Sequence, residues 1–156
     1  MKVEFINPFI SGAFTVLSMM LGEAPEKGSL NVLPKSFTSQ QVNVVIGVTG
    51  EIQGMLLIGM SLVTADKIAS LMIGQPVKTF DELASSAIAE LGNMIGGNGL
   101  LQLSETGLHC DLTPPTVIRG TNVEISTLAL PAIVVPLKLS VGEVSLTVGL
   151  RCPQKN

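Results

Sequence analysis

A hydroxyl, a carboxylate and an amide follow one another along a predicted helix near the middle of the chain. Ser86, Glu90, Asn93 and Gly97 lie at positions i, i+4, i+7 and i+11, so a helix brings them into one row on the same face. The carboxylate can anchor a cation and the amide can hold a water molecule, while Gly97 leaves the end of the row bare. The row by itself fits two interpretations, a solvated helix face or a functional site that uses these polar groups.

The helix that carries this row is predicted to run from Thr79 to Leu103. Thr79 and Glu82 form a capping box, and Asp81 lies in the first turn, where the helix dipole favours negative charge. Apolar residues recur at three- and four-residue spacing beside the row, which predicts a buried stripe at the helical period. The predicted stripe consists of Leu83, Ala84, Ala87, Ile88, Leu91, Met94 and Ile95.

Glycines interrupt the second half of this helix at positions 92, 96, 97 and 99. Each costs about 1 kcal/mol relative to alanine in a helix interior, so a requirement other than helix stability selects them. Close approach of another chain segment is one such requirement. A strip of small residues also predicts close packing of the first helix: Ser85, Ala89, Gly92 and Gly96.

The string Ser86-x3-Glu90-x2-Asn93, followed by Pro114 and Pro115, resembles the motif of the CheC/CheX/FliY phosphatases of bacterial chemotaxis. The resemblance is closest to the CheX branch and covers nearly the whole chain. It includes the segments VEFINPFI, VNVVIGVTGEIQGMLLIGMS, DELASSAIAELGNM and DLTPPTV. Members of this family hydrolyse the aspartyl phosphate of a CheY-like response regulator, so the resemblance implies a phosphatase of chemotaxis or a related two-component pathway.

The resemblance also implies roles for single residues. Phosphoryl transfer is catalysed mostly by positioning and electrostatics, and the regulator itself supplies Mg2+ and a lysine around its phosphoaspartate. Asn93 is then expected to orient the attacking water, as a glutamine does in GTPases, and Glu90 to anchor the helix to the regulator's lysine. No cofactor is expected on this chain. The expected contact residues are Ser86, Gly97, Pro114 and Pro115.

A non-catalytic binding or scaffold module is the alternative interpretation. Flagellar switch components of the same fold family contact regulators and one another without this chemistry. The Glu90-x2-Asn93 pair favours the phosphatase over the module. The resemblance to CheX, together with strands that cannot all be interior in one small sheet, further predicts a homodimer.

Glu4 and Asn7 repeat the Glu-x2-Asn spacing near the start of the chain, and CheC relatives can carry two active centres. Pro8 directly after Asn7, however, predicts that the first helix begins there. Glu4 would then precede the helix and would not share a face with Asn7. The sequence therefore favours Asn7 as a helix cap.

Composition excludes several classes of partner. The net charge is -3, and the nine lysines and arginines form no cluster, so neither nucleic acid nor an anionic membrane is an expected partner. The charge-free run from Phe5 to Gly22 contains polar residues and proline and follows Glu4, which favours a buried helix over a signal peptide or membrane span. Two cysteines, Cys110 and Cys152, are expected to stay reduced. These features predict a cytoplasmic protein.

Two further motifs carry no predicted site. His109 and Cys110 are adjacent, but two ligand types without further His or Cys make no metal site. The glycines from 96 to 99 lack the Lys-Ser/Thr of a phosphate-binding loop and come late in a helix. No metal or nucleotide site is therefore predicted.

The rest of the chain reads as strands joined by hairpins. Residues 30–33, 41–48 and 52–60 are predicted strands, followed by a helix over Thr64–Met72 that ends at Gly74. Residues 111–118 are predicted to form an edge or irregular strand, because they run through two prolines. Three more strands are predicted over 123–130, 132–139 and 143–150. The pattern predicts one α+β domain over residues 1–156, with an antiparallel sheet packed against about three helices and no internal repeat.

Overall fold

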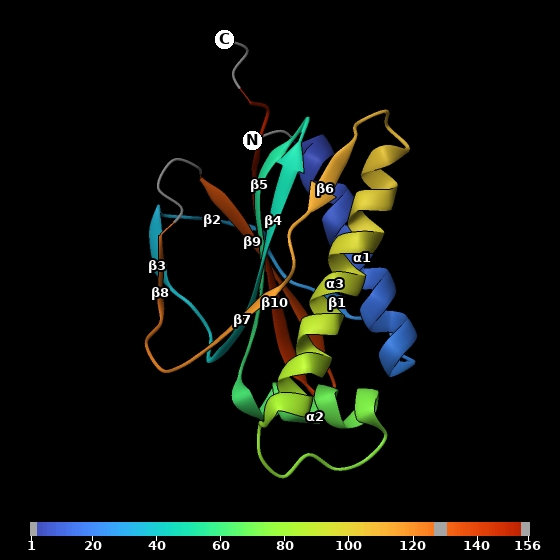
Figure 1. The fold of residues 1–156 in the computed structure, drawn as a ribbon, viewed down its shortest axis with the longest axis vertical. Helices are drawn as coiled ribbons and strands as arrows, with labels where there is room; N and C mark the ends of the chain where they lie inside the picture. The colour runs from blue at the N-terminus through green and yellow to red at the C-terminus, as the bar shows by residue number, and fades with distance from the viewer. Residues whose placement is uncertain (1–2, 127–130, 154–156) are drawn as a thin grey trace.

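The structure, a computed structural model, describes residues 3–126 and 131–153 of the chain. Two long helices lie side by side on one face of a sheet, and a shorter helix crosses one end of it (Figure 1). Within the described residues, the helices are α1 (Val3–Leu21), α2 (Leu62–Ile73) and α3 (Glu82–Ser104). The predicted α+β class is confirmed.

The strands form one large sheet and one small ribbon, and every pair is antiparallel. The sheet has the order β1-β9-β10-β5-β4-β6, with β2 also paired to β9 and β7 to β4, and β3 pairs with β8 in the ribbon. The strand bounds are β1 (Glu26–Lys27), β2 (Asn31–Leu33), β3 (Ser36–Thr38), β4 (Val42–Gly50), β5 (Gln53–Met60), β6 (Cys110–Leu112), β7 (Thr116–Arg119), β8 (Glu124–Ser126), β9 (Ala132–Leu139) and β10 (Gly142–Arg151).

The predicted hairpins are confirmed, since β4 turns directly into β5 and β9 into β10. The predicted strand over 123–130 is present as β8, and its residues 127–130 lie outside the described part of the chain. The predicted irregular strand over 111–118 is two strands at the sheet edge, β6 and β7, interrupted at the prolines. The sequence pattern misses β1 and β3, which are two and three residues long and too short to show alternation.

Helix α3 begins later than predicted. The Asp81 carboxylate accepts a hydrogen bond from the Ala84 N–H over 2.9 Å, so Asp81 is the N-cap and the predicted Thr79–Glu82 capping box is wrong. Most of the predicted stripe is buried or half-buried, but Leu83 is 56% exposed. The fully buried residues of the stripe are Ala84, Ile88, Leu91 and Ile95.

Helix α1 begins earlier than predicted. It starts at Val3 and contains Pro8 in its interior, so the predicted start at Asn7 and Pro8 is wrong. Proline lacks an N–H, which leaves the Glu4 carbonyl without its helical donor, but that carbonyl lies in the first turn beside an exposed side chain. Burial of Phe5 and Ile6, at 7% and 1% exposure, outweighs this single missing bond, since each large apolar side chain contributes about 1.5–3 kcal/mol.

Burial also accounts for the apolar composition of α1. Of the helices in residues 3–126 and 131–153, α1 alone has the length and hydropathy to cross a membrane. Its apolar side is packed into the core, with Phe9 and Leu17 at 0% exposure. A helix buried along one side in this way needs the same composition as a membrane span.

Glycines in α3 allow close approach on two sides. A β-carbon at Gly99 would lie 2.4 Å from the Phe9 Cδ1 atom of α1, so this glycine lets the two long helices touch. A β-carbon at Gly92 would lie 2.6 Å from Val44 Cγ1 in β4, and one at Gly96 would lie 3.0 Å from Leu112 Cδ1 in β6. The predicted packing of the first helix against the strip containing Gly92 and Gly96 is therefore wrong, because those two glycines face the sheet.

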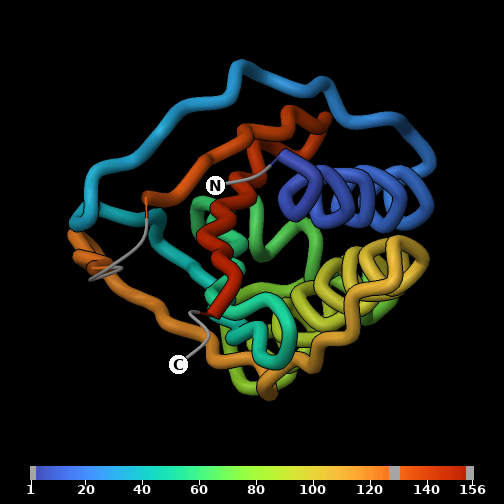
Figure 2. The backbone as a smooth tube through the Cα atoms, turned by 90° about the horizontal axis from the view of Figure 1, so that it is seen from above, coloured from blue at the N-terminus to red at the C-terminus, as the bar shows by residue number. Residues whose placement is uncertain are grey.

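The elements that follow α1 recur in the same order after α3. Each long helix leads to two short strands at an outer edge of the sheet, then to a strand of the ribbon and a hairpin, and the hairpins meet at the β5–β10 pair. Equivalent hydrogen bonds fix the edges, from the Gly28 N–H to the Pro136 carbonyl over 2.8 Å and from the Thr113 N–H to the Gly47 carbonyl over 2.9 Å. The two halves run along opposite sides of the molecule (Figure 2). The sequence shows no repeated string, but the architecture is repeated.

Candidate functional site

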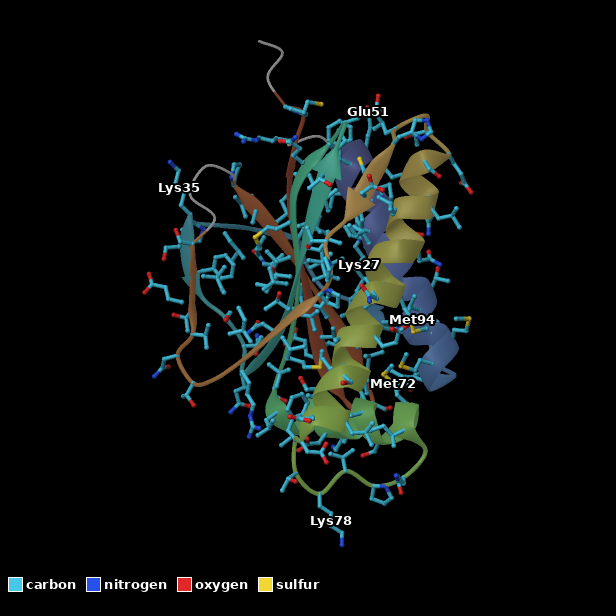
Figure 3. All side chains as sticks on the ribbon, in the orientation of Figure 1. Lys27, Lys35, Glu51, Met72, Lys78 and Met94 are labelled. Atoms are coloured by element: carbon cyan, nitrogen blue, oxygen red, sulfur yellow. The ribbon has the colours of Figure 1, made fainter. Side chains whose placement is uncertain are left out.

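The predicted row lies on the outer side of α3 and is exposed along its length. Its members are Ser86, Glu90, Asn93 and Gly97. The buried stripe of the same helix faces the core, so packing of the helix holds the row toward solvent. Figure 3 draws the side chains of α3, with Met94, the neighbour of Asn93, labelled midway along the helix.

The two central side chains of the row have no partner within the described part of the chain. Neither the Glu90 carboxylate nor the Asn93 amide takes part in any hydrogen bond or ion pair with residues 3–126 or 131–153. Asn98 provides a contrast on the same helix, because its Oδ1 accepts a hydrogen bond from Gln102 Nε2 over 2.8 Å. The Glu90 and Asn93 groups are therefore available to bind a partner or water.

The predicted prolines lie on a segment that runs along helix α3. The segment from β6 to β7 follows α3, because Leu112 contacts the helix near Gly96 and Arg119 reaches the residues before the helix. Arg119 Nη1 donates to the Phe80 carbonyl over 3.0 Å, and the guanidinium lies 5.5 Å from the Phe80 ring centroid. Pro114 and Pro115 fall between these two anchors, so they border the middle of the helix; the first is exposed and the second half-buried.

The position of the proline segment is fixed from the sheet side. The Thr113 hydroxyl accepts a hydrogen bond from the Gly47 N–H over 2.8 Å, in addition to the backbone bond from the Thr113 N–H to the Gly47 carbonyl. Proline also restricts the backbone of the residue before it. The segment is therefore tied to β4 at Thr113, directly before the two prolines.

A hollow of about 470 Å³ opens at the end of the row, between α3 and β6. Nothing lies within 4 Å of the place where a β-carbon at Gly97 would stand, so a partner can approach the helix backbone there. Sequence reasoning missed this hollow, because it arises where a helix and a distant edge strand meet. Its lining residues are Gly97, Leu100, Leu101, Ser104, His109, Cys110 and Asp111.

The described residues contain no group of three or more His, Cys, Asp or Glu side chains placed to hold a metal. The Cys110 sulfur instead takes part in a hydrogen bond within the protein, which it accepts from the Ile52 N–H over 3.4 Å. The chemistry open to the row on α3 is thus to anchor a cationic group through Glu90 and to position water through Asn93.

The first helix carries a second pair of the same kind. Glu4 and Asn7 both lie inside α1 and both are exposed, so the prediction that Glu4 precedes the helix is wrong. The pair occupies one face of α1, as Glu90 and Asn93 do on α3. The pattern of buried and exposed residues is similar around the two pairs, with Ser11 of α1 at the position that corresponds to Gly97 of α3.

Residues 42–138 match the family model described as Chemotaxis phosphatase CheX. The matched segment is more than half of the 156-residue chain and contains both Glu90-x2-Asn93 and the two prolines. The chain belongs to the CheX family. The match to the family model begins at residue 42, after α1, so the Glu4–Asn7 pair lies outside the matched segment.

Individual relatives and solved structures agree with this assignment. A protein of Thermotoga maritima named CheY-P phosphatase CheX is 34% identical over 128 residues, which cover 81% of this chain and 83% of the relative. A CheC-like superfamily protein from Shewanella sp. PV-4 has a crystal structure with a TM-score of 0.87 and 27% identity, covering 97% of this chain and 99% of that one. The crystal structure of a CheX-CheY-BeF3-Mg2+ complex from Borrelia burgdorferi has a TM-score of 0.83 and 29% identity. The match covers 96% of this chain and 99% of that one.

Proposed function

We propose that this chain is a phosphatase that hydrolyses the phosphoaspartate of a CheY-like response regulator. The observation that carries the proposal is the exposed Glu90–Asn93 pair on α3, which has no hydrogen-bond or ion-pair partner within the described residues. Membership of the CheX family supports it, as does the name of the Thermotoga relative. The Borrelia complex adds support, because beryllofluoride is a phosphoryl analogue and that relative is seen with CheY and Mg2+.

Asn93 is the residue proposed to act on the reacting atoms. An acyl phosphate needs a water molecule in line with the phosphorus, and most of the catalysis comes from positioning and from charge stabilisation. The Asn93 amide offers both an acceptor and a donor, so it can accept from the water and hold its oxygen toward the phosphorus. The Mg2+ that offsets the phosphoryl charge is proposed to belong to the regulator.

Glu90 is proposed to fix the amide in place. It lies one turn from Asn93, with β-carbons about 5–6 Å apart, so both side chains can reach one shallow site. A carboxylate at that distance can pair with the regulator's active-site lysine. Ser86, Gly97, Pro114 and Pro115 are proposed to contact the surrounding surface of the regulator.

A phosphate-release assay with the phosphorylated regulators of the same cell tests the proposal. We expect this chain to accelerate phosphate release from one of these regulators. The rate should depend on the concentration of phosphorylated regulator as Michaelis–Menten kinetics require. A non-catalytic module would bind such a regulator and leave its own rate of dephosphorylation unchanged, and that result would refute the phosphatase proposal.

We expect the chain to be a homodimer in solution. The proposal rests on its membership of the CheX family and on short outer strands, β1 with β2 and β6 with β7, that leave backbone groups at the sheet edges available for pairing. Light scattering measures the mass directly. A monomer mass of 16.3 kDa at micromolar concentration would contradict the proposal.

Cytoplasmic localisation is proposed on the same family grounds.

The second pair, Glu4 and Asn7 on α1, is proposed to form a weaker centre for the same regulator. Its support is the repeated architecture and the matching exposure of the two helices. We expect it to be weaker because Ser11 carries a side chain where Gly97 leaves the backbone of α3 bare.

Calorimetric titration with regulator loaded with Mg2+ and beryllofluoride tests the second centre. Two sites per chain are expected, of which Glu90→Ala should weaken the tighter one and Glu4→Ala the weaker one. Glu143→Ala, which removes an exposed carboxylate from β10, is the control for net charge. A single site per chain whose affinity Glu4→Ala leaves unchanged would show that α1 has no such role.

A further inference from the structure

A cavity lies on the face of the sheet that is turned away from the long helices. Strand residues alternate between the two faces, and Val44 of β4 and Ile58 of β5 belong to the core that α1 and α3 cover. Their neighbours Asn43 and Gly59 therefore point to the other face, on the side of the β3–β8 ribbon (Figure 1). A cavity of about 140 Å³ is present there, between the sheet and the segment 33–40.

A glycine makes room for the cavity in its floor. Asn43, Gly59 and Ser145 lie side by side on β4, β5 and β10, because Gly59 is paired with both of the others. The missing side chain at Gly59 leaves a gap between them. Thr147, two residues further along β10, points to the same face as Ser145 and is paired with Leu57. The floor therefore combines polar groups with the apolar surface of a leucine.

A buried carbonyl in this floor has no hydrogen-bond partner within the described residues. Asn43 is 0% exposed, and its Nδ2 donates to Ser39 Oγ over 3.0 Å and to the Gln40 carbonyl over 2.7 Å. A carbonyl only accepts, so the second contact identifies the nitrogen of the amide and leaves Oδ1 on its other side. Oδ1 lies 3.0 Å from the place where a β-carbon at Gly59 would stand, at the gap in the floor. It accepts no hydrogen bond there, and a buried acceptor without a donor costs free energy.

The side chain of Gln40 lies over the gap and is able to leave it. Its Cγ is 2.9 Å from the place where the Gly59 β-carbon would stand. Gln40 is exposed, and its side-chain amide makes no hydrogen bond with residues 3–126 or 131–153. Rotation of this side chain therefore uncovers the Asn43 Oδ1 without breaking a hydrogen bond. The Ser145 and Thr147 hydroxyls are also unpartnered within these residues, so they are available to a ligand.

The lining determines the class of ligand. Among the described residues it contains no charged side chain, and burial of an unpaired charge is costly, so a neutral ligand is favoured. The Asn43 Oδ1 requires an N–H or O–H donor, while Phe37, Leu57 and Val134 offer an apolar surface to the rest of the molecule. An apolar cavity of about 150 Å³ holds benzene. A cavity of about 140 Å³ therefore has room for about six non-hydrogen atoms.

We propose that this cavity binds a small neutral molecule with an N–H or O–H donor at one end and an apolar body. The donor bonds to Asn43 Oδ1 once Gln40 has moved, an acceptor atom of the ligand takes the Ser145 hydroxyl proton, and the apolar body lies against Leu57. Short primary amides have this form. The inference is independent of the proposed phosphatase function, because the cavity and α3 lie on opposite faces of the sheet.

Three molecules of nearly the same shape test the requirement for a donor. Isobutyramide, 3-methylbutan-2-one and isobutyrate share one arrangement of non-hydrogen atoms and differ in carrying an amide NH2, a methyl group or a second carboxylate oxygen. Each is titrated into the whole chain and followed by the methyl NMR signals of Leu57 and Val134. We expect isobutyramide to bind with a millimolar Kd, which suits a ligand of this size, and the other two to bind about tenfold more weakly or less.

Two variants place the binding in the cavity. Ser145→Ala removes one hydroxyl from the floor and should raise the Kd for isobutyramide about fivefold. Gly59→Ala fills the gap beside Oδ1 and should abolish binding. Ser29→Ala makes the same change as the first variant at an exposed position outside the lining, and it should keep the wild-type Kd. Circular dichroism shows whether each variant is folded.

Four results would overturn the proposal. One is the absence of any shift at Leu57 up to about 100 mM isobutyramide, and another is an equal Kd for the three molecules, since the donor would then not be recognised. A wild-type Kd in folded Ser145→Ala and Gly59→Ala would place the binding elsewhere. Leu57 signals that change on dilution of the protein without any probe would show that a second copy of the chain covers the cavity.

Discussion

Asn93→Ala is expected to lower turnover at saturating phosphorylated regulator by about a hundredfold or more, the scale of losing one contact made only in the transition state. The amide is exposed and unpartnered within the described residues, so its removal takes nothing from the fold. Alanine is also the best helix former. Affinity for regulator loaded with Mg2+ and beryllofluoride should survive, because docking is assigned to other residues. Single-turnover dephosphorylation measures the first quantity and titration the second.

Asn98→Ala is the matched control for this experiment. It makes the same chemical change on the same helix, at a half-buried position where the amide already accepts a hydrogen bond from Gln102. Its turnover should stay near wild type. Wild-type turnover in a folded Asn93→Ala variant would refute the proposed mechanism, whatever the control does.

The row on α3 and the helix that carries it were predictable from the sequence, because helical spacing is a local property. The stripe from Ala84 to Ile95 has the helical period, and packing at that period turns the polar row outward. Leu83 is the exception, and its position explains it. It lies seven residues before Glu90 and so shares the exposed face of that residue, which the sheet does not reach.

The start of α1 was not predictable from local signals alone. Pro8 is a strong signal for a first helical residue, and the sequence gives no measure of how much apolar surface lies beyond it. The structure shows this apolar surface, because the helix extends back to Val3 and thereby buries Phe5 and Ile6. The consequence reaches the site, since the extension brings Glu4 and Asn7 onto one helical face.

The hollow and the repeated architecture depend on contacts between segments far apart in the chain. The His109 N–H, on the β6 side of the hollow, donates a hydrogen bond to Glu51, and no periodicity in either segment predicts that contact. Likewise, Gly99 was visible as a costly residue in a helix, but its neighbour Phe9 was not. Sequence patterns identify positions under constraint, and tertiary packing determines which partner imposes the constraint.

Glu90→Ala is expected to weaken the complex with the regulator as well as to slow its hydrolysis. If the carboxylate pairs with the regulator's lysine in a site from which docking removes water, truncating it leaves that lysine without its partner. Loss of one member of such a pair costs on the order of 2–5 kcal/mol, which is a change of about 30-fold or more in Kd. Titration against regulator loaded with Mg2+ and beryllofluoride measures this loss.

Glu90→Gln separates charge from shape in the same experiment. It keeps the length of the side chain and an acceptor oxygen but removes the charge, so it should weaken binding nearly as much as Glu90→Ala if the ion pair is what docks the helix. Wild-type affinity should fall with rising salt more steeply than that of Glu90→Gln, because screening acts on the charge that this variant lacks. Equal salt dependence, or wild-type affinity in Glu90→Ala with turnover lost, would instead place Glu90 with Asn93 at the reacting atoms and leave docking to the rest of the row.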